Sequence, residues 1–226
     1  MRCSVCAGTQ FVDHAILWDG LVNEWQLSPH ERAYVDRQQG TMCAGCGANL
    51  RSMALADALC KTFGTSLPLG AFVRTPEAQQ IRILEINAAG SLTATLKNMA
   101  GHVYGEYPEL DMSNLSFPEA SFDIVCHSDT LEHVPNPRHA LGECRRVLKP
   151  GGRLCFTIPI IVGRLSRDRT GLAKSYHGTP TLGRDDFVVH TEFGADAWTY
   201  LIDAGFSNVA FSAFEFPAGL ALTASR

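Results

Sequence analysis

The clearest alternation of apolar and polar positions lies in the middle of the chain. Two short runs, Phe122–Cys126 and Arg153–Ile158, are apolar on both faces, which is typical of strands in a parallel sheet covered on both sides. Between them, apolar side chains recur at helical spacing from Pro137 onward, and the Pro-Gly-Gly sequence at residues 150–152 ends the helix. The pattern predicts a right-handed β-α-β unit.

The flanking stretches continue the alternation of strands and helices. Further strands are predicted at Ile81–Ile86, His102–Tyr104, Phe206–Phe216 and Leu220–Ser225, and further helices at Leu92–Met99 and Gly194–Ala204. The last two strands flank a Pro-Ala-Gly sequence and are expected to pair antiparallel. These elements indicate an α/β fold with helices on both faces of the sheet.

Cysteines near the N-terminus come in two pairs with the same spacing. Cys3 and Cys6 form the first pair, and Cys43 and Cys46 form the second. Two such knuckles bring four thiolates within reach of one tetrahedral zinc ion, and Gly47 eases the turn after the second pair. Because four cysteines leave no open coordination position, the zinc is predicted to be structural. A redox pair, which would need a thioredoxin-like context, and cysteines without a function are the alternatives.

The residues between and after the cysteine pairs also show helical signals. Ser28-Pro29-His30-Glu31 is a capping box, and Gly40 marks the end of that helix. A second helix is predicted at Asn49–Phe63. We therefore divide the chain into a zinc-binding module at residues 1–64, a linker at 65–80 and a main domain at 81–226.

Composition and charge narrow the function classes. With 19 basic and 23 acidic residues, the chain has a net charge of −4 and no overall electrostatic footprint for nucleic acid. No stretch approaches the roughly 20 continuous apolar residues of a membrane helix. The N-terminus lacks the apolar core of a signal peptide, and eight cysteines without one suggest a reducing compartment. A cytoplasmic enzyme without a membrane partner is expected.

Two motifs of the central stretch carry a resemblance to a known family. They read FDIVCHSDTLEHV and LGECRRVLKPGGRLCFTIP, and together they resemble the class I S-adenosylmethionine-dependent methyltransferases, in particular the small-molecule branch. The resemblance extends over residues 81–226. It implies a Rossmann-like sheet of seven strands, with S-adenosylmethionine lying across the carboxyl ends of the strands. The cysteine pairs followed by a helix also resemble N-terminal zinc modules attached to some methyltransferases.

The loop after the first strand departs from the family's glycine-rich pattern. It reads Glu85-Ile86-Asn87-Ala88-Ala89-Gly90, so that Gly90 alone remains of the usual glycines. Asn87 is a good substitute where a positive φ is needed. The missing GxGxxG sequence argues against a nicotinamide enzyme.

Acidic residues follow where the family binds the nucleoside. Glu106 falls 21 positions after Glu85, near the spacing at which a carboxylate meets ribose hydroxyls. Asp111 and Met112 resemble the family's adenine segment. A solvated glutamate and a turn-starting aspartate are the alternatives. The cofactor-binding residues implied in total are Glu85, Asn87, Gly90, Glu106, Asp111, Met112 and Ser128.

Two residues after the fourth strand are candidates for a catalytic base. Asp129 and His133 follow the strand whose end lies beside the cofactor methyl group in the family. Transfer to a hydroxyl gains about 10²–10⁴-fold from a positioned base. Alternatively, Asp129 caps the following helix and His133 packs against it.

A long polar segment after residue 159 is predicted to cover the acceptor side of the crevice. It carries the candidate substrate-binding residues Arg164, Arg167, Arg169 and His177. The arginines favour a phosphate or carboxylate, although such runs are more often solvated.

The sequence therefore predicts an S-adenosylmethionine-dependent methyltransferase with a structural zinc module. A small-molecule acceptor is expected, with an oxygen of a sugar-containing or anionic metabolite preferred. One alternative is an RNA or protein methyltransferase that docks through the zinc module, although the charge and the lack of an aromatic-basic stripe argue against RNA. The other is a non-catalytic cofactor-binding scaffold, which the eroded glycine loop would explain.

Overall fold

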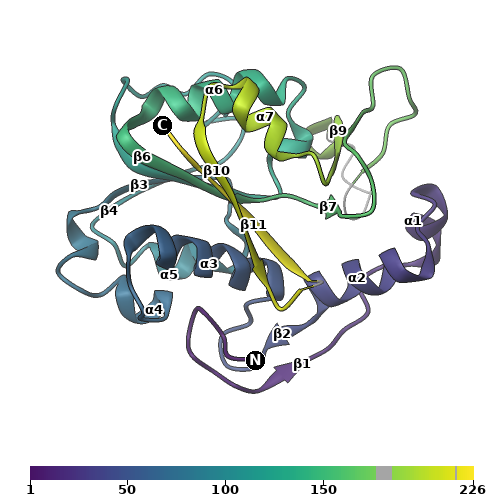
Figure 1. Cartoon of the computed structure of the whole chain (residues 1–226), viewed down its shortest axis with the longest axis horizontal. Helices are drawn as coiled ribbons and strands as arrows, with labels where there is room; N and C mark the ends of the chain where they lie inside the picture. Colours follow the sequence, from purple (N-terminus) through teal and green to yellow (C-terminus); the bar gives the residue numbers. More distant parts are fainter. Residues whose placement is uncertain (177–184, 217) are drawn as a thin grey trace.

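A six-stranded mixed sheet forms the centre of the molecule (Figure 1). The computed structural model describes residues 1–176, 185–216 and 218–226. The strand order is β10-β11-β6-β5-β3-β4. Strands β3, β4, β5 and β6 are parallel to one another, and β11 runs antiparallel to both of its neighbours, β6 and β10. The strands are β3 (Arg82–Ile86), β4 (Gly101–Gly105), β5 (Phe122–Ser128), β6 (Leu148–Thr157), β10 (Ser207–Phe214) and β11 (Gly219–Ser225).

Helices cover both faces of this sheet, as predicted. One face carries α6 (Pro137–Val147) and α7 (Trp198–Asp203), and the other carries α3 (Leu50–Phe63), α4 (Leu69–Phe72) and α5 (Thr93–Leu96) (Figure 1). Neighbouring strand residues point to opposite faces, so Leu84 joins the α6 core while Ile83 joins the α3 core. No helix among the described residues is long and apolar enough to span a bilayer.

Among the described residues, the central sheet has six strands instead of the expected seven. Only residues 106–121 separate β4 from β5, and they contain turns but no helix or strand. A parallel crossover alone needs a dozen or more residues, so this segment cannot supply a helix, another parallel strand and a return crossover. The Rossmann-like fold class is confirmed by the mixed sheet with helices on both faces, whereas the prediction of a seventh strand was wrong.

The N-terminal region packs directly against the sheet. A two-stranded sheet, β1 (Phe11–Val12) with β2 (Met42–Cys43), and the helices α1 (Asp19–Glu24) and α2 (Pro29–Gly40) precede α3. The predicted capping box at the start of α2 is present. The expected linker holds α4 and the 3₁₀ turn Ala78–Gln80. Cysteines of both pairs and the α3 core share one hydrophobic cluster with the sheet, so the packing is continuous, while the predicted domain boundaries stay predictions.

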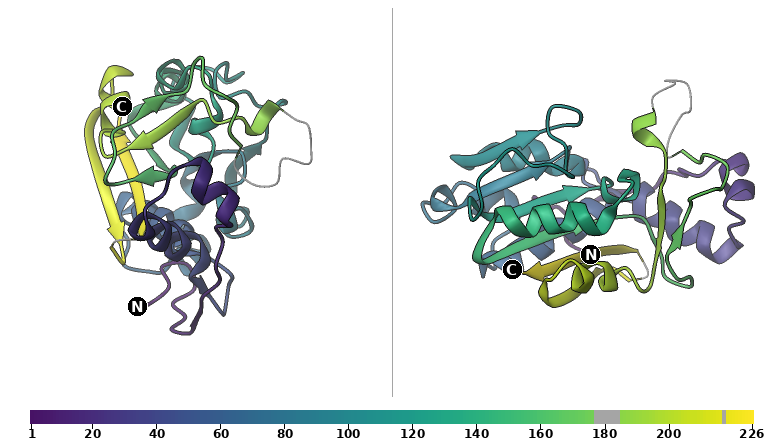
Figure 2. Two further views of the ribbon diagram at one scale, coloured as in Figure 1. Left: turned by 90° about the vertical axis from the view of Figure 1, so that its right-hand side faces the viewer. Right: turned by 90° about the horizontal axis from the view of Figure 1, so that it is seen from above.

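The segment after β6 is tied to the N-terminal helices. It forms a small sheet of β7 (Ile160–Ile161), β8 (Arg167–Asp168) and β9 (Thr191–Gly194), and lies beside α1 and α2 (Figure 2). The Arg164 guanidinium donates to Glu31 Oε1 at 2.6 Å and to the carbonyl oxygens of Trp25 and Gln26 at 3.0 and 2.8 Å. This bond from Arg164 lowers the pKa of Glu31 to about 2. Arg164 therefore links the segment after β7 to the N-terminal helices, which lie far away in the sequence.

The close contact between α3 and β11 yields a first prediction. A Cβ atom at Gly219 would lie 2.4 Å from the Leu50 carbonyl oxygen and 2.9 Å from the Ala54 Cβ. We expect Gly219→Ala to lower the free energy of unfolding by about 1–3 kcal/mol in urea titrations. Gly142→Ala is the control, because a Cβ atom at Gly142 would have no neighbouring atom within 4 Å. In the interior of a helix such as α6, alanine is more stable than glycine by about 0.5–1 kcal/mol. Equal effects of the two substitutions would contradict this packing.

The Arg164–Glu31 pair yields a pH-dependent prediction. Because the folded-state pKa of Glu31 lies below its usual 4.5, the pair stabilises the fold fully above pH 4.5 and progressively less as the pH falls toward 2. We expect Glu31→Gln to lower the free energy of unfolding by about 1 kcal/mol at neutral pH, with a difference from the parent that shrinks over that acidic range. Urea unfolding at a series of pH values measures this. The exposed Glu109→Gln is the control, and a difference independent of pH would refute the ion pair.

Candidate functional site

A cavity of about 640 Å³ lies at the carboxyl ends of β3, β4 and β5. The chain leaves β3 toward β4 on one side, and β5 pairs with β3 on the other, so this is the point where the strand order reverses. Open α/β sheets bind ligands at such a switch point. The volume is in the range of about 300–1,000 Å³ for small-molecule sites.

Most residues predicted from the sequence meet in this one cavity. The predicted cofactor residues that line it are Asn87, Gly90, Glu106, Asp111, Met112 and Ser128. Both candidate bases, Asp129 and His133, line it as well. Tyr107, Asp186 and Phe187 also line it, and sequence reasoning did not name them as site residues.

The Glu85 side chain stabilises the loop after β3 by hydrogen bonds and does not line the cavity. Its fully buried carboxylate accepts hydrogen bonds from the Ala89 amide at 2.8 Å and the Thr93 hydroxyl at 2.5 Å. The loop then places Asn87 at φ 55° and Gly90 at φ 57°. The positive φ expected of Asn87 is confirmed. A Cβ atom at Gly90 would lie 2.6 Å from the Ser52 hydroxyl on α3, which explains why glycine stands here.

The acidic side of the cavity is held by local hydrogen bonds. The Tyr104 hydroxyl donates a hydrogen bond to Glu106. Burial is the largest cause that raises the pKa of Tyr104 to about 12, and this hydrogen bond is the second. The Asp111 carboxylate accepts from the Ser113 amide at 2.7 Å, so Asp111 starts a turn while it also lines the cavity. The two interpretations of Asp111 are therefore compatible.

A second cavity of about 350 Å³ adjoins the first. Asp129, His133 and Phe187 line both cavities. The remaining wall is mainly apolar and comes from the segment between the cysteine pairs and from β7: Ile16, Leu17, Trp18, Leu21, Trp25, Leu27, Val35, Ile160 and Ile161. Sequence reasoning did not find this cavity.

A buried arginine positions Asp129. Arg51 on α3 forms an ion pair with the Asp129 carboxylate, and only 4% of the Arg51 side chain is exposed. Its other terminal nitrogen donates to Gln38 Oε1 at 2.7 Å. Asp129 has φ 48°, and the N-cap of α6 is Asn136. Asp129 therefore does not cap α6, and the overlooked signal was Arg51, a charged residue on the buried side of α3.

The backbone at Val188 orients His133. Its Nδ1 lies 3.1 Å from the Val188 carbonyl oxygen, which can only accept, so Nδ1 donates. Nε2 is then the basic nitrogen of the neutral ring. His127, by contrast, is fully buried, and burial lowers its pKa to about 3. His127 therefore stays neutral inside the core.

The predicted substrate arginines lie outside both cavities. Arg164 binds Glu31, and Arg169 forms an ion pair with Glu192. Arg167 is exposed in β8. His177 lies outside the described residues. The anionic acceptor stays a prediction.

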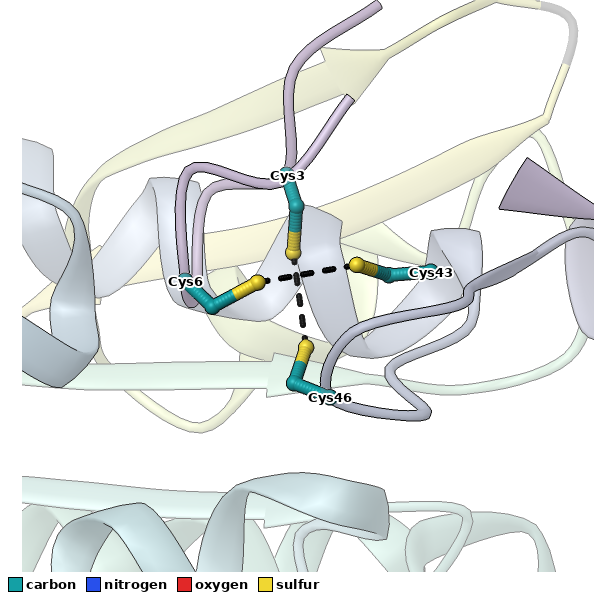
Figure 3. Close-up of side chains that lie close together, drawn as sticks. All are labelled: Cys3, Cys6, Cys43 and Cys46. Carbon is teal, nitrogen blue, oxygen red and sulfur yellow. Dashed lines mark hydrogen bonds between the residues drawn. The ribbon is translucent and has the colours of Figure 1, made fainter. Parts of the chain in front are cut away.

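The four paired cysteines converge on one point (Figure 3). Their sulfur atoms all lie within 4.8 Å of one another, with 3.6 Å between Cys3 and Cys46 and 3.5 Å between Cys6 and Cys43. A zinc ion with bonds of about 2.3 Å requires tetrahedral sulfurs about 3.8 Å apart. Ala7 and Gly47, each next after a pair, share the left-handed conformation at φ 64° and 73°. The cluster is compatible with one tetrahedral zinc.

Curated relatives are similar to part of this chain. The ubiquinone/menaquinone biosynthesis C-methyltransferase UbiE of Brucella anthropi is 31% identical over 134 residues, which cover 55% of this chain and 46% of that protein. The ubiquinone biosynthesis O-methyltransferase of Paracidovorax citrulli is 26% identical over 158 residues, covering 66% and 59%. The 27-O-demethylrifamycin SV methyltransferase of Amycolatopsis mediterranei is 46% identical over 46 residues, covering 20% and 17%. The chain thus spans about half or less of the length of most of these relatives.

A family model and a solved structure complete the comparison. An S-adenosylmethionine-dependent methyltransferase from Mesorhizobium loti aligns with a TM-score of 0.46 and 18% identity, over 70% of this chain and 95% of that one. The family model described as "Methyltransferase domain" (Methyltransf_11) matches residues 42–156, about half of the chain. The chain therefore belongs to the methyltransferase-domain family, within the class I S-adenosylmethionine-dependent methyltransferases.

Proposed function

We propose that this protein transfers a methyl group from S-adenosylmethionine to an oxygen atom of a small molecule. The observation that carries the proposal is the cavity at the switch point, where six of the residues expected to bind the cofactor meet both candidate bases. Family membership supports the cofactor, and the relatives named as ubiquinone and rifamycin methyltransferases support a small-molecule acceptor.

The residues present fit this cofactor. Glu106 accepts hydrogen bonds from the ribose hydroxyls, while Asp111 accepts one from the adenine amino group and Met112 packs on the ring. Asn87 and Gly90 let the backbone pass close to the methionine part. When bound, S-adenosylmethionine supplies a methyl group already activated on a sulfonium.

The protein's own part in the reaction is alignment and proton removal. Holding the acceptor oxygen in line with the methyl carbon supplies several kcal/mol, because it replaces a bimolecular encounter. The bound cofactor would supply the methyl group to the acceptor oxygen, and the proton lost by that oxygen would pass to a base of the protein. We assign that role to Asp129 and His133, and the fact that both line the two cavities supports the assignment. The ion pairs of Arg164 and Arg169 weigh against the sugar-containing or anionic acceptor that the sequence favours.

We also propose that the four-cysteine cluster binds one structural zinc ion. Four thiolates complete the tetrahedral coordination, so no position is left for water or substrate. The sulfur spacing supports zinc rather than two disulfides, since the sulfur atoms of Cys3 and Cys46 lie 3.6 Å apart and those of Cys6 and Cys43 lie 3.5 Å apart, well beyond the length of a disulfide bond.

The zinc proposal predicts one ion per chain. Native mass spectrometry should find the mass of one zinc, and Cys43→Ser should lose it because three thiolates remain. Cys60→Ser, which alters a buried cysteine outside the cluster, should keep the metal. A metal-free parent whose four clustered thiols react freely with a thiol reagent would disprove the proposal.

The cofactor proposal predicts a loss of affinity at Glu106. Glu106→Ala should weaken binding of S-adenosylhomocysteine by about 1.5–3 kcal/mol, the range for hydrogen bonds to charged groups, as measured by calorimetry. Glu109→Ala is the control, since Glu109 is exposed and does not line the cavity. Unchanged affinity in Glu106→Ala would place the ribose elsewhere, and no binding by the parent would refute the proposed function.

A further inference from the structure

We infer that the second cavity is the acceptor site, and that the segment between the two cysteine pairs makes it selective for a neutral, flat and largely apolar molecule, such as a hydroxylated aromatic ring system. This inference rests on the proposed function and names its substrate class. The occupant follows from the volume, the lining and the charge balance of the cavity.

The size and lining of the cavity suit a ring system. Its volume of about 350 Å³ is at the lower end of small-molecule sites. Two tryptophans, Trp18 and Trp25, contribute to a wall that is otherwise mostly aliphatic. Trp18 is 48% exposed and Ile16 is 40% exposed, so the wall presents apolar surface that a ligand would remove from water.

The charged side chains that line the second cavity neutralise each other without a ligand. Within the part of the chain that the structure describes, Arg51 and Asp129 are the charged residues that line this cavity, and they form an ion pair with each other. Arg51 also donates to Gln38. A carboxylate or phosphate on the acceptor would therefore lack a cation of its own and would face the Asp129 carboxylate, which is unfavourable in a partly buried site.

The polar end of the cavity lies where the two cavities meet. Asp129, His133 and Phe187 line both, so an acceptor whose apolar body lies among the tryptophans can direct one hydroxyl toward the cofactor cavity. A hydroxyl there meets Asp129, which Arg51 holds in place, and His133, which the Val188 carbonyl orients. In this arrangement the hydroxyl of the acceptor has hydrogen-bond partners, and the apolar body of the acceptor is buried against the carbon atoms of the wall.

The wall is fixed before the acceptor arrives. The Asp36 carboxylate accepts from the Ile16 and Leu17 amides, each at 2.8 Å. The Trp25 indole donates to the Ser175 hydroxyl at 2.9 Å, and Arg164 binds the Trp25 carbonyl oxygen. At either end of the segment stands a cysteine pair of the cluster. A preformed wall loses less entropy on binding, which favours a rigid, flat ligand.

Ligand-observed NMR titrations with two matched probes test the inference. In the presence of saturating S-adenosylhomocysteine, neutral 2-naphthol should bind at least about tenfold more tightly than anionic naphthalene-2-sulfonate, a difference of 1.4 kcal/mol. Trp18→Ala should weaken 2-naphthol binding about tenfold, since an exposed wall residue can be removed without unfolding the chain. Ile202→Ala is the control, because Ile202 is 47% exposed on α7 and lines neither cavity.

The outcomes separate the two proposals. Equal or tighter binding of the sulfonate, binding of 2-naphthol that ignores Trp18→Ala, or binding of neither probe would overturn the apolar acceptor site. Calorimetry of S-adenosylhomocysteine on the same samples reports on the proposed function by itself. Intact cofactor binding in Trp18→Ala shows that the variant is folded, whereas absent cofactor binding in the parent would overturn the proposed function.

Discussion

The ion pair between Arg51 and Asp129 is the interaction on which the site depends. Only 4% of the Arg51 side chain is exposed, and a buried guanidinium is tolerated only with a charged partner and hydrogen bonds. The pair joins the first turn of α3 to the carboxyl end of β5 across the boundary of the two cavities. Removing either member would leave the other charge uncompensated, so Asp129 has a structural role whether or not it accepts a proton.

This pair makes the N-terminal region part of the proposed active site. Helix α3 begins directly after the second cysteine pair and shares a hydrophobic cluster with Cys3 and Cys43. Through Arg51, the position of that helix sets the position of Asp129. The segment between the cysteine pairs meanwhile supplies the wall of the second cavity. A structural metal at the cysteines would therefore hold both ends of the acceptor site without touching a substrate.

The sequence predicted those features that depend on neighbouring residues. The capping box of α2, the left-handed Asn87 and the helix after Asn49 follow from local rules of backbone geometry. Features made by distant segments were missed. Arg164 looked like a substrate clamp because its partner Glu31 lies far away in the chain, and the second cavity joins residues 16–39, Arg51, Asp129 and β7. The seventh strand was expected from family resemblance although residues 106–121 are too few to form it.

We expect the methyl group to be transferred where the two cavities meet, beside Asp129 and His133. A crystal structure of the protein with S-adenosylhomocysteine would locate the sulfur atom from which the methyl group leaves. The nucleoside is expected to lie along Glu106 and Asp111, with the sulfur at the junction and directed toward the second cavity. A sulfur directed away from Asp129 and His133, with the second cavity closed off from it, would show that transfer takes place elsewhere.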